Sequence, residues 1–363
     1  MGDGRVRTVL ITGGAGFIGC NLAARLLETT QARIWIYDNL SRLHVSTNLN
    51  WLRSLPAADR RLQVVIGDVR DGERLRQVAK GCTEIYHLAA QVAVTTSLQS
   101  PVDDFEINAR GTLNVLEAAR RQPDPPFLLF TSTNKVYGAL ESLHLRATGT
   151  RYTTEDPSFR GATESLPLDF HSPYGCSKGA ADQYVRDYAR IYNIPSVVFR
   201  MSCICGPHQF GTEDQGWVAH FLYSLLYGQT VTIYGDGRQV RDLLHVDDLL
   251  DAMEAARVQI SRARGQVYNL GGGLERAASV NEILAMIEEM LQCEPRYAFG
   301  AVRPGDQPLY ISDTTKLERD TGWAPRRSIR QVLQDISRFA EAHPQVAPSL
   351  ASSEAAVSEG KVA

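Results

Sequence analysis

The sequence predicts an α/β fold, in which helices cover both faces of a doubly wound parallel sheet and a smaller C-terminal lobe lies beside it. In the N-terminal part, apolar runs of strand length alternate with longer amphipathic segments, which is the pattern of repeated βαβ units. The first apolar run leads directly into a glycine-rich turn and a helical segment. After about Gly206 the apolar runs shorten, while glycine and aromatic residues increase. These three observations predict two lobes.

The elements of this fold follow from apolar runs and helical periodicity. The predicted strands of the main sheet are Thr8–Ile11, Arg33–Tyr37, Leu62–Ile66, Glu84–His87, Phe127–Thr131 and Ser196–Arg200. The segments long enough to cross back over that sheet are Phe17–Leu27, Glu73–Lys80, Val102–Arg121 and Gly175–Ile191. Later in the chain we expect strands at Thr232–Tyr234 and Gln266–Leu270, and helices at Val280–Leu291 and Ser328–Glu341.

The composition excludes several classes of protein. The 363 residues are 44% hydrophobic and 22% charged, which is typical of a globular chain with a large core. Lys and Arg (38) nearly balance Asp and Glu (41), so we expect neither a nucleic-acid nor a membrane partner. The longest uncharged stretch, Gln215 to Gly235, is interrupted by polar residues and does not predict a bilayer span. The six cysteines lack paired metal-ligand spacing, so we expect no metal and reduced thiols in a cytoplasm.

A glycine motif indicates a dinucleotide site. Gly13, Gly16 and Gly19 follow the first strand and open the first helix, where free N–H groups can bind a pyrophosphate. Asp38 lies 19 residues after Gly19, at the end of the second strand, and is placed to accept hydrogen bonds from a ribose diol. Because its carboxylate repels a 2′-phosphate, we expect NAD rather than NADP, although Arg42 weakens this preference.

Further residues at strand ends are expected at the same cofactor. Asp68 ends the third strand and is placed to bond the adenine edge; a simple surface turn is the alternative. The small residues after the fourth strand let the backbone run close to a dinucleotide. The remaining residues that we expect to line the cofactor are Phe17, Ile18, Asn39, Ser41, Val69, Leu88, Ala89, Ala90, Gln91 and Thr131.

A tyrosine and a lysine predict the catalytic chemistry. Tyr174 and Lys178 are four residues apart in a helical segment and therefore share one helix face. A neighbouring ammonium and a positive nicotinamide ring both favour the phenolate, which suits Tyr174 as a general base. An ordinary surface Tyr–Lys pair is the alternative. Thr131, Ser132 and Thr133 end the fifth strand, where a hydroxyl can orient an alcohol for reversible hydride transfer.

These motifs resemble the extended short-chain dehydrogenases/reductases of the nucleotide-sugar epimerase/dehydratase family, over about Thr8 to Phe339. The resemblance implies a Rossmann domain that binds NAD over residues 1–205, to which the strand and helix of 240–270 return. It also implies a nucleotide-sugar lobe over 206–345, and we expect a mobile tail over 346–363. The family pattern assigns the catalytic hydroxyl to Thr133, the base to Tyr174 and its lysine to Lys178, and it brings Asn108 and Ser202 to the cofactor.

The residues after Thr133 distinguish the reactions of this family. Dehydratases carry an Asp-Glu pair there as acid and base for the loss of water, whereas this chain has Asn134 and Lys135. Dehydration is therefore disfavoured, and oxidation followed by return of the hydride is expected. A 4-epimerase, a net sugar-nucleotide reductase and a non-catalytic NAD-binding regulatory protein are the alternatives.

Three segments, Thr131–Gly138, Leu168–Tyr184 and Gln209–Trp217, resemble one subgroup, the CDP-paratose 2-epimerases. This resemblance implies oxidation at carbon 2 of a CDP-hexose by tightly bound NAD, in a homodimer formed through Val102–Arg121 and Gly175–Ile191. Cys205 and His208 stand where relatives more often have Tyr and Arg. The residues expected to bind the sugar nucleotide are Thr133, Asn134, Lys135, Gln209, Gln215, Tyr234, Arg241 and Arg303.

Overall fold

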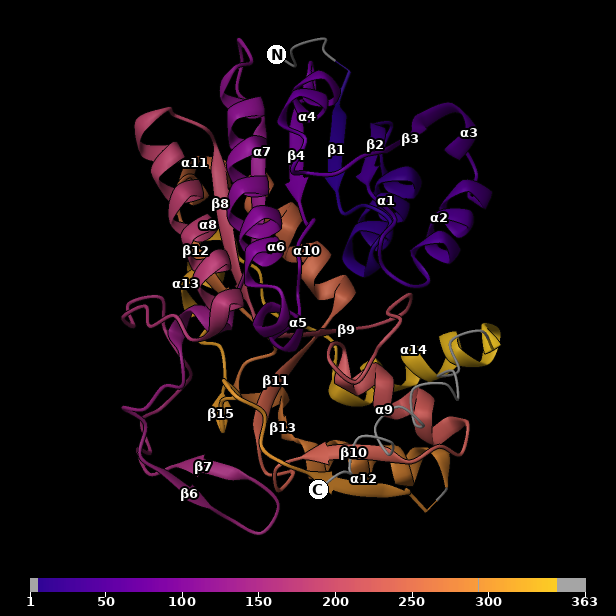
Figure 1. Cartoon of the computed structure of the whole chain (residues 1–363), viewed down its shortest axis with the longest axis vertical. Helices are drawn as coiled ribbons and strands as arrows, with labels where there is room; N and C mark the ends of the chain where they lie inside the picture. The colour runs from indigo at the N-terminus through magenta and orange to yellow at the C-terminus, as the bar shows by residue number, and fades with distance from the viewer. Residues whose placement is uncertain (1–5, 293, 345–363) are drawn as a thin grey trace, which may run out of the picture.

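The computed structural model describes residues 6–292 and 294–344, so the tail predicted over 346–363 lies outside the described residues. Its main sheet has seven parallel strands in the order β12-β8-β5-β4-β1-β2-β3 (Figure 1), and the predicted fold class is confirmed. The strands are β1 (Thr8–Thr12), β2 (Arg33–Asp38), β3 (Leu62–Ile66), β4 (Glu84–His87), β5 (Phe127–Thr133), β8 (Ser196–Met201) and β12 (Val267–Leu270).

Helices cover both faces of this sheet because alternate residues of each central strand point to opposite sides. Val9 and Ile11 of β1 pack in one apolar cluster with α1 (Phe17–Thr29) and α10 (Val246–Val258). Leu10 belongs to a second cluster on the other face. There, α4 (Gly72–Ala79), α7 (Gly111–Arg120) and α8 (Ser172–Ile191) lie side by side (Figure 1).

The single helix predicted over Val102–Arg121 is wrong in detail. The segment begins as α6 (Pro101–Phe105), widens into one π-helical turn, η1 (Glu106–Arg110), and continues as α7. The π turn contains Asn108, which reaches across to the backbone of Gln91 and to Ser177. Such a widening depends on contacts made in the folded protein, and such turns are frequent at functional sites.

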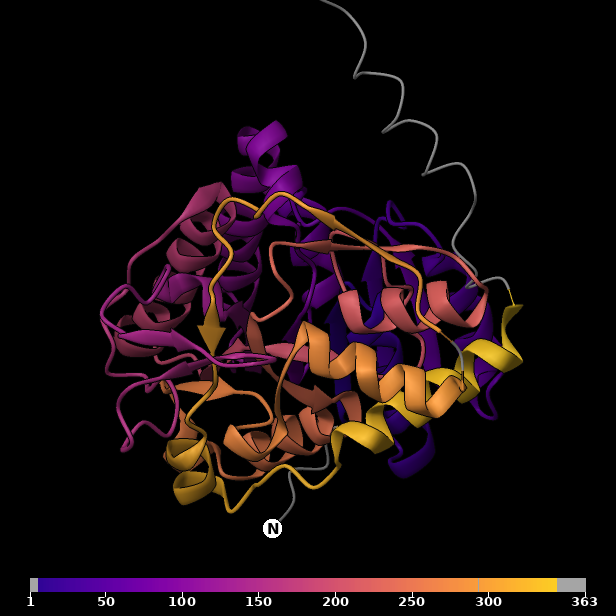
Figure 2. The ribbon, with the colours of Figure 1, turned by 90° about the horizontal axis from the view of Figure 1, so that it is seen from below.

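The second lobe builds its own core from three helices and short strands. In Figure 2, α9 (Trp217–Leu226), α12 (Val280–Leu291) and α14 (Ile329–Ala342) lie side by side, and their apolar faces form one cluster. The strands of this lobe are β9 (Cys203–Cys205), β10 (Val231–Tyr234), β11 (Val240–His245), β13 (Ala277–Ser279), β14 (Tyr297–Gly300) and β15 (Leu309–Tyr310). The remaining elements are α2 (Val45–Ser54), α3 (Ala58–Arg61), α5 (Val94–Gln99), η2 (Asn134–Tyr137), β6 (Leu145–Ala147), β7 (Tyr152–Thr154), α11 (Ile260–Ala263), η3 (Leu274–Arg276) and α13 (Thr315–Thr321).

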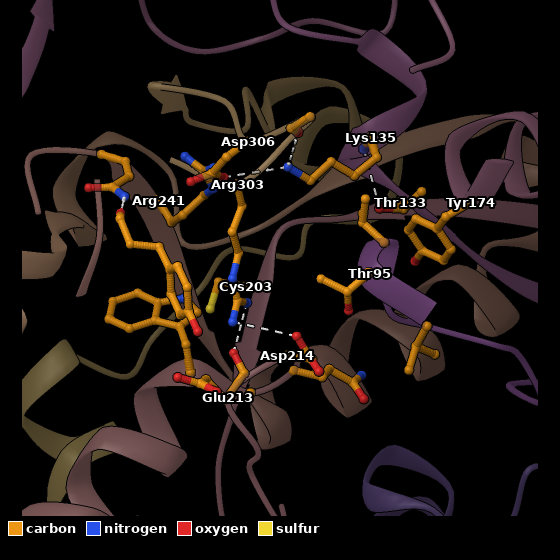
Figure 3. Close-up of a pocket in the computed structure, with 18 of the residues that line it drawn as sticks. Thr95, Thr133, Lys135, Tyr174, Cys203, Glu213, Asp214, Arg241, Arg303 and Asp306 are labelled. Carbon is orange, nitrogen blue, oxygen red and sulfur yellow. Dashed lines mark hydrogen bonds and ion pairs between the residues drawn. The ribbon is translucent and has the colours of Figure 1, made fainter. Parts of the chain in front are cut away.

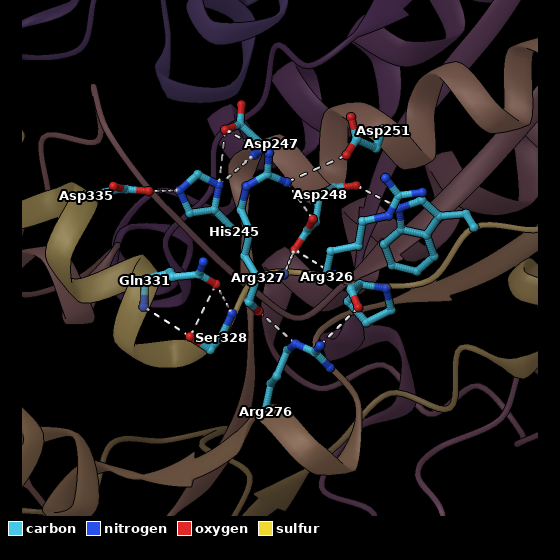
Figure 4. Close-up of polar contacts among 12 residues, drawn as sticks. His245, Asp247, Asp248, Asp251, Arg276, Arg326, Arg327, Ser328, Gln331 and Asp335 are labelled. Carbon is cyan, nitrogen blue, oxygen red and sulfur yellow. Dashed lines mark hydrogen bonds and ion pairs between the residues drawn. The ribbon is translucent and has the colours of Figure 1, made fainter.

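A buried carboxylate attaches the start of α14 to α10. Asp248 accepts hydrogen bonds from the backbone N–H of Arg327 at 3.0 Å and from its guanidinium at 2.6 Å (Figure 4). Ser328 and Gln331 then form a reciprocal capping box that begins the helix. This anchor fixes the C-terminal helix against both lobes.

A second buried ion pair fixes α8 on the sheet. The guanidinium of Arg200 on β8 donates to both carboxylate oxygens of Asp182 on α8, at 2.8 and 2.9 Å. The two side chains are 2% and 0% exposed. Arg200 also donates to the Tyr137 hydroxyl at 2.9 Å, so its charge is hydrogen-bonded on more than one side.

In the part of the chain that the structure describes, no helix combines the length and apolar character needed to cross a membrane. Among the same residues, no group of three or more His, Cys, Asp or Glu side chains is arranged to hold a metal ion.

We predict that Asp182→Asn lowers the free energy of unfolding by about 3–5 kcal/mol, because it leaves the buried Arg200 cation without a counter-charge. Urea denaturation followed by circular dichroism measures the change. The matched control is Asp187→Asn, an exposed position on the same helix, which should change stability by less than about 0.5 kcal/mol. Equal stability of the two variants would contradict a structural role for the pair.

Candidate active site

A cavity of about 330 Å³ lies between the C-terminal end of the main sheet and the second lobe. Figure 3 shows Thr133, Lys135 and Tyr174 on one side of it, with Arg241 and Arg303 on another. Ligands of open α/β sheets collect at this edge, because the helices begin there. The cavity is lined by all of the residues predicted to bind substrate except one.

The exception is Gln209, which is only 8% exposed and does not line the cavity. Its side-chain amide donates to the backbone carbonyl of Ile204 at 3.0 Å and so supports the loop from inside. Gln209 was predicted at the substrate because its segment resembles that of relatives. That resemblance does not show that the side chain points inward.

Burial is the main cause of the shifted pKa values of Tyr174 and Lys178, the two groups predicted for catalysis. It raises the pKa of Tyr174, which is hydrogen-bonded to Thr133, to about 12. It lowers the pKa of Lys178 to about 7. The Lys178 ammonium donates to the Thr131 carbonyl at 2.6 Å and lies 4.2 Å from the centre of the Phe130 ring. The predicted lowering of the Tyr174 pKa by a neighbouring ammonium is therefore not seen in the polypeptide alone.

The glycine turn has the shape that a dinucleotide requires. Gly13 has φ +69°, and a Cβ there would lie 2.7 Å from the backbone nitrogen of Ala89. A Cβ on Gly19 would lie 2.4 Å from the carbonyl oxygen of Gly13. No side chain caps the start of α1, which leaves this helix end for an anion. The residues present therefore fit NAD.

Two acidic residues, Asp38 as the last residue of β2 and Asp68 just after β3, complete the cofactor cradle, which is the proposed NAD site formed by the glycine turn and these residues. The Asp38 carboxylate accepts from the backbone N–H of Ala15 at 3.0 Å and of Leu40 at 2.8 Å, which joins it to the glycine turn. Asn39 donates to Asp68 at 2.9 Å. A hydrogen bond from Arg70 lowers the pKa of Asp68 to about 2. These bonds hold both carboxylates at the edge of the cradle as acceptors.

Two of the residues predicted at the cofactor make other contacts. Asn108 bonds both the N–H and the carbonyl of Gln91, at 2.9 and 3.1 Å, and so shapes the loop rather than facing the cradle. The Ser202 hydroxyl donates to the buried Asp242. Arg42, also predicted there, contacts Gln215 and thereby connects the cofactor cradle to the substrate lobe.

The substrate side of the cavity is rich in cations. Arg241 donates to Asp306 at 2.6 Å, and Lys135 donates to the Gly305 carbonyl at 3.0 Å. Burial lowers the pKa of Lys135 to about 8, so this lysine differs from the ordinary one that the sequence suggested, yet it is mostly charged at pH 7. The Arg303 guanidinium lies 3.7 Å from the centre of the Tyr234 ring.

Sequence reasoning missed Asp306 and Gln307 as parts of this site. It selected the arginines because a diphosphate needs cations, whereas Asp306 acts by pairing with Arg241 and Lys135. Their position in the sequence could have indicated both residues, because Asp306 and Gln307 closely follow the predicted substrate residue Arg303.

Comparison with known proteins identifies the family to which this chain belongs. The sequence profile of the family described as GDP-mannose 4,6 dehydratase matches residues 10–336. The chain belongs to this family. Together with the parallel sheet, this match confirms the family that the motifs indicated.

Members with different reactions resemble the chain. CDP-paratose 2-epimerase of Salmonella typhi is 42% identical over 335 residues, covering 90% of this chain and 97% of that protein. A dTDP-glucose 4,6-dehydratase of Neisseria gonorrhoeae is 32% identical over 348 residues, covering 90% and 94%. The crystal structure of UDP-glucuronic acid 4-epimerase from Bacillus cereus, in complex with UDP-glucuronic acid and NAD, superposes with a TM-score of 0.78 at 25% identity, covering 92% and 99%.

Two positions where the sequence departs from the family pattern, Cys205 and His208, do not line the cavity. The His208 ring stacks on Trp51 with centroids 3.6 Å apart, and burial lowers its pKa to about 4. Cys205 is fully buried, and its sulfur lies 3.6 Å from that of Cys203, which lines the cavity. These two departures therefore change packing rather than a side chain in the cavity.

We predict that buried Lys178 makes stability rise with pH. Its pKa is near 10.4 in an unfolded chain and about 7 in the fold, so between these values the unfolded chain binds the extra proton. Relative to Lys178→Met, the free energy of unfolding of the wild type should rise by about 2 kcal/mol from pH 7 to pH 9. Urea denaturation measures it. Lys80→Met, at an exposed position, is the control. Parallel pH curves for the wild type and Lys178→Met would show that Lys178 keeps its proton.

Proposed function

We propose that the protein is an NAD-dependent nucleotide-sugar epimerase that oxidises carbon 2 of a CDP-hexose and reduces it again on the opposite face. The observation that carries this proposal is the 42% identity to CDP-paratose 2-epimerase over nearly the whole of both chains. The cavity supports it, because Thr133, Tyr174 and the Asn134–Lys135 pair all line the same space.

In this proposal Tyr174 takes the proton of the reacting hydroxyl and later returns it, while Thr133 orients that hydroxyl. Lys178 holds the nicotinamide ribose from within α8. When bound, NAD supplies the acceptor and then the donor of one hydride, so the two steps leave no net oxidation. The tyrosine gains and loses one proton in the same cycle, and the products differ from the substrate only in configuration.

The cavity argues against dehydration. An elimination needs a carboxylic acid and a base beside the catalytic hydroxyl. Asn134 has an amide instead, and Lys135 is bonded to Gly305 and paired with Asp306 at 3.7 Å. A lysine whose pKa is about 8 is mostly protonated near pH 7 and is a poor proton acceptor there.

Cations at the far side of the cavity suit a diphosphate. Arg241 and Arg303 approach it from β11 and from the segment before β15, and guanidinium groups bind phosphate oxygens in pairs. The Tyr234 ring beneath Arg303 offers a flat surface at the nucleoside end. We therefore propose that these residues bind the CDP part, while Thr133, Asn134 and Lys135 face the sugar.

We predict that the purified protein converts CDP-paratose to CDP-tyvelose without added cofactor, and that NAD rather than NADP is released on denaturation. NMR of the sugar protons measures the conversion. Tyr174→Phe should reduce the rate by about 10²–10⁴-fold with the cofactor still bound, because the base is lost. Tyr192→Phe, at an exposed position just after α8, is the matched control.

Other outcomes distinguish the alternatives. Turnover of UDP-sugars with inversion at carbon 4 would identify a 4-epimerase, and steady consumption of NADH would identify a reductase. Binding of NAD with no turnover across CDP-, UDP-, GDP- and dTDP-sugars would refute the epimerase and favour a regulatory protein.

We also propose a homodimer through the face formed by α5, α6 and α8. This face exposes three large apolar side chains to water: Val102 (72%), Phe105 (53%) and Ile191 (63%). A dimer whose two copies present the same face would bury them. The cytoplasmic location expected from the cysteine pattern stays a prediction; the five cysteines described by the structure are free thiols.

For this dimer we predict a mass in light scattering of twice that of one chain. Phe105→Asp should shift the protein toward monomer, because it places a charge in the proposed apolar contact. Phe299→Asp, at a 62% exposed position on β14 in the other lobe, is the matched control and should leave the mass unchanged. A monomeric wild type would contradict the proposal.

A further inference from the structure

The segment between β9 and α9 of the second lobe is bonded to the start of α1 in the other lobe. Asn21 on α1 donates through its side-chain nitrogen to the Phe17 carbonyl at 2.8 Å and to the Pro207 carbonyl at 3.0 Å. Phe17 begins α1 directly after the glycine turn, whereas Pro207 lies in the segment that follows β9. An amide nitrogen carries two hydrogens, so one group serves both sides. Asn21 therefore holds the second lobe against the cofactor cradle.

Asn48 on α2 makes a second bridge of the same kind and is only 1% exposed. Its side-chain nitrogen donates to the Ala15 carbonyl, in the glycine turn, at 3.2 Å and to the His208 carbonyl at 3.3 Å. Its oxygen lies 3.3 Å from Nδ1 of the His208 ring. Because both amide hydrogens are used on carbonyls, which only accept, the Asn48 oxygen must accept and Nδ1 of His208 must carry the proton. This order of bonds fixes the tautomer of His208.

The His208 ring also contacts an aromatic side chain from each lobe. Its centroid lies 3.6 Å from that of Trp51 on α2, with the rings stacked, and 4.6 Å from that of Phe339 on α14. His208 therefore joins the two lobes by stacking as well as by hydrogen bonds. We call Asn21, Asn48 and His208 the interlobe latch.

The same segment continues from the latch to the substrate cavity. Its residues Glu213, Asp214 and Gln215 line that cavity. Gln215 also contacts Arg42, which lies four residues after Asp38 of the cofactor cradle. The segment is therefore bonded to the cofactor lobe at two places, the glycine turn and the chain that follows β2.

We propose that Asn21, Asn48 and His208 close the second lobe over the cofactor cradle and set the rate at which NAD is released. The segment cannot move away from the glycine turn unless its hydrogen bonds to both asparagines break and the His208 ring leaves Trp51. Slow release suits the proposed reaction, because the reduced cofactor has to stay with its keto sugar until the hydride is returned. The latch acts on the cofactor alone, whichever sugar the protein uses.

The test measures exchange of NAD in the holoenzyme without any sugar nucleotide. Protein loaded with radiolabelled NAD is chased with excess unlabelled NAD, and the label that stays on the protein gives koff. Asn48→Ala removes three hydrogen bonds of the latch and should raise koff about 10–100-fold. His208→Phe keeps an aromatic ring on Trp51 but loses the bond to Asn48, so it should raise koff about 3–10-fold. His208→Ala loses the stack as well and should raise koff further.

The association rate separates a latch from a merely structural role. A latch slows entry as well as exit, so a weaker latch should raise koff without lowering kon, which follows from koff and the Kd measured by equilibrium dialysis. Damage to the glycine turn lowers kon instead, because the site must then re-form during binding. Asn281→Ala is the matched control, since this amide on α12 donates to the Asp236 carbonyl at 3.2 Å within the second lobe, and it should change koff less than about 2-fold.

Coupling between the members gives a further check. In an Asn48→Ala background, His208→Phe should raise koff less than about 2-fold more, since the bond it removes is already lost. If Asn48→Ala does not fold, His208→Phe and Asn21→Ala carry the same test. A koff equal to that of wild type in these variants would overturn the proposal, as would a rise in koff accompanied by an equal fall in kon. Because no sugar nucleotide is used, a protein that turns over none of them refutes the epimerase and leaves this test intact.

Discussion

The active site depends on the buried ion pair between Arg200 and Asp182. It joins β8, the second strand from one edge of the sheet, to α8, whose first two turns carry Tyr174 and Lys178. Two charges taken out of water are costly unless each is fully hydrogen-bonded, so the pair favours the placement of α8 in which both charges are bonded. Tyr137 extends the contact to β12 by donating to Asn269 at 2.7 Å. The helix that carries Tyr174 and Lys178 is thus fixed by groups that do not line the cavity.

Burial also sets the charge state of Tyr174 and Lys178, the two groups predicted for catalysis. The Lys178 ammonium donates to the Thr131 carbonyl rather than to a carboxylate, and the nearby charges of Asp104 and Asp182 favour its charged form. Burial pushes Tyr174 toward its neutral form as well. In the polypeptide alone both groups therefore favour neutrality, and the phenolate that the chemistry needs requires a positive charge beside Tyr174. The sequence argument assigned this effect to the Lys178 ammonium and to the nicotinamide ring together, and in the polypeptide alone the ammonium does not produce it.

The sequence predicts those parts of the fold that are determined by neighbouring residues of the chain, and it misses those that depend on contacts between distant residues. The strands of the main sheet were predicted to within two residues because each is a short run rich in apolar residues, and the central strands β1, β4 and β5 are buried on both faces. The break of Val102–Arg121 into a π turn was missed, because it is stabilised by Asn108 reaching residues distant in sequence. In the site, the cavity collects Thr133, Tyr174 and Arg303 as predicted, since catalytic hydroxyls, bases and cations are recognisable types. Gln307 was missed because an amide acquires a role only through the partners that folding gives it.

Hydrogen bonds from Asn134 and Lys135 to one short segment of the second lobe connect the two lobes. Asn134 and Lys135 follow the catalytic Thr133, and both bond the stretch from Gly305 to Gln307, which begins two residues after Arg303. Asp306 in that stretch pairs with Arg241 and Lys135. In the proposed function, a diphosphate bound at Arg241 would compete with Asp306 for the same guanidinium. Because Asp306 precedes Gln307, which accepts a hydrogen bond from Asn134, binding at the nucleotide end is expected to affect the position of Asn134 at the sugar end.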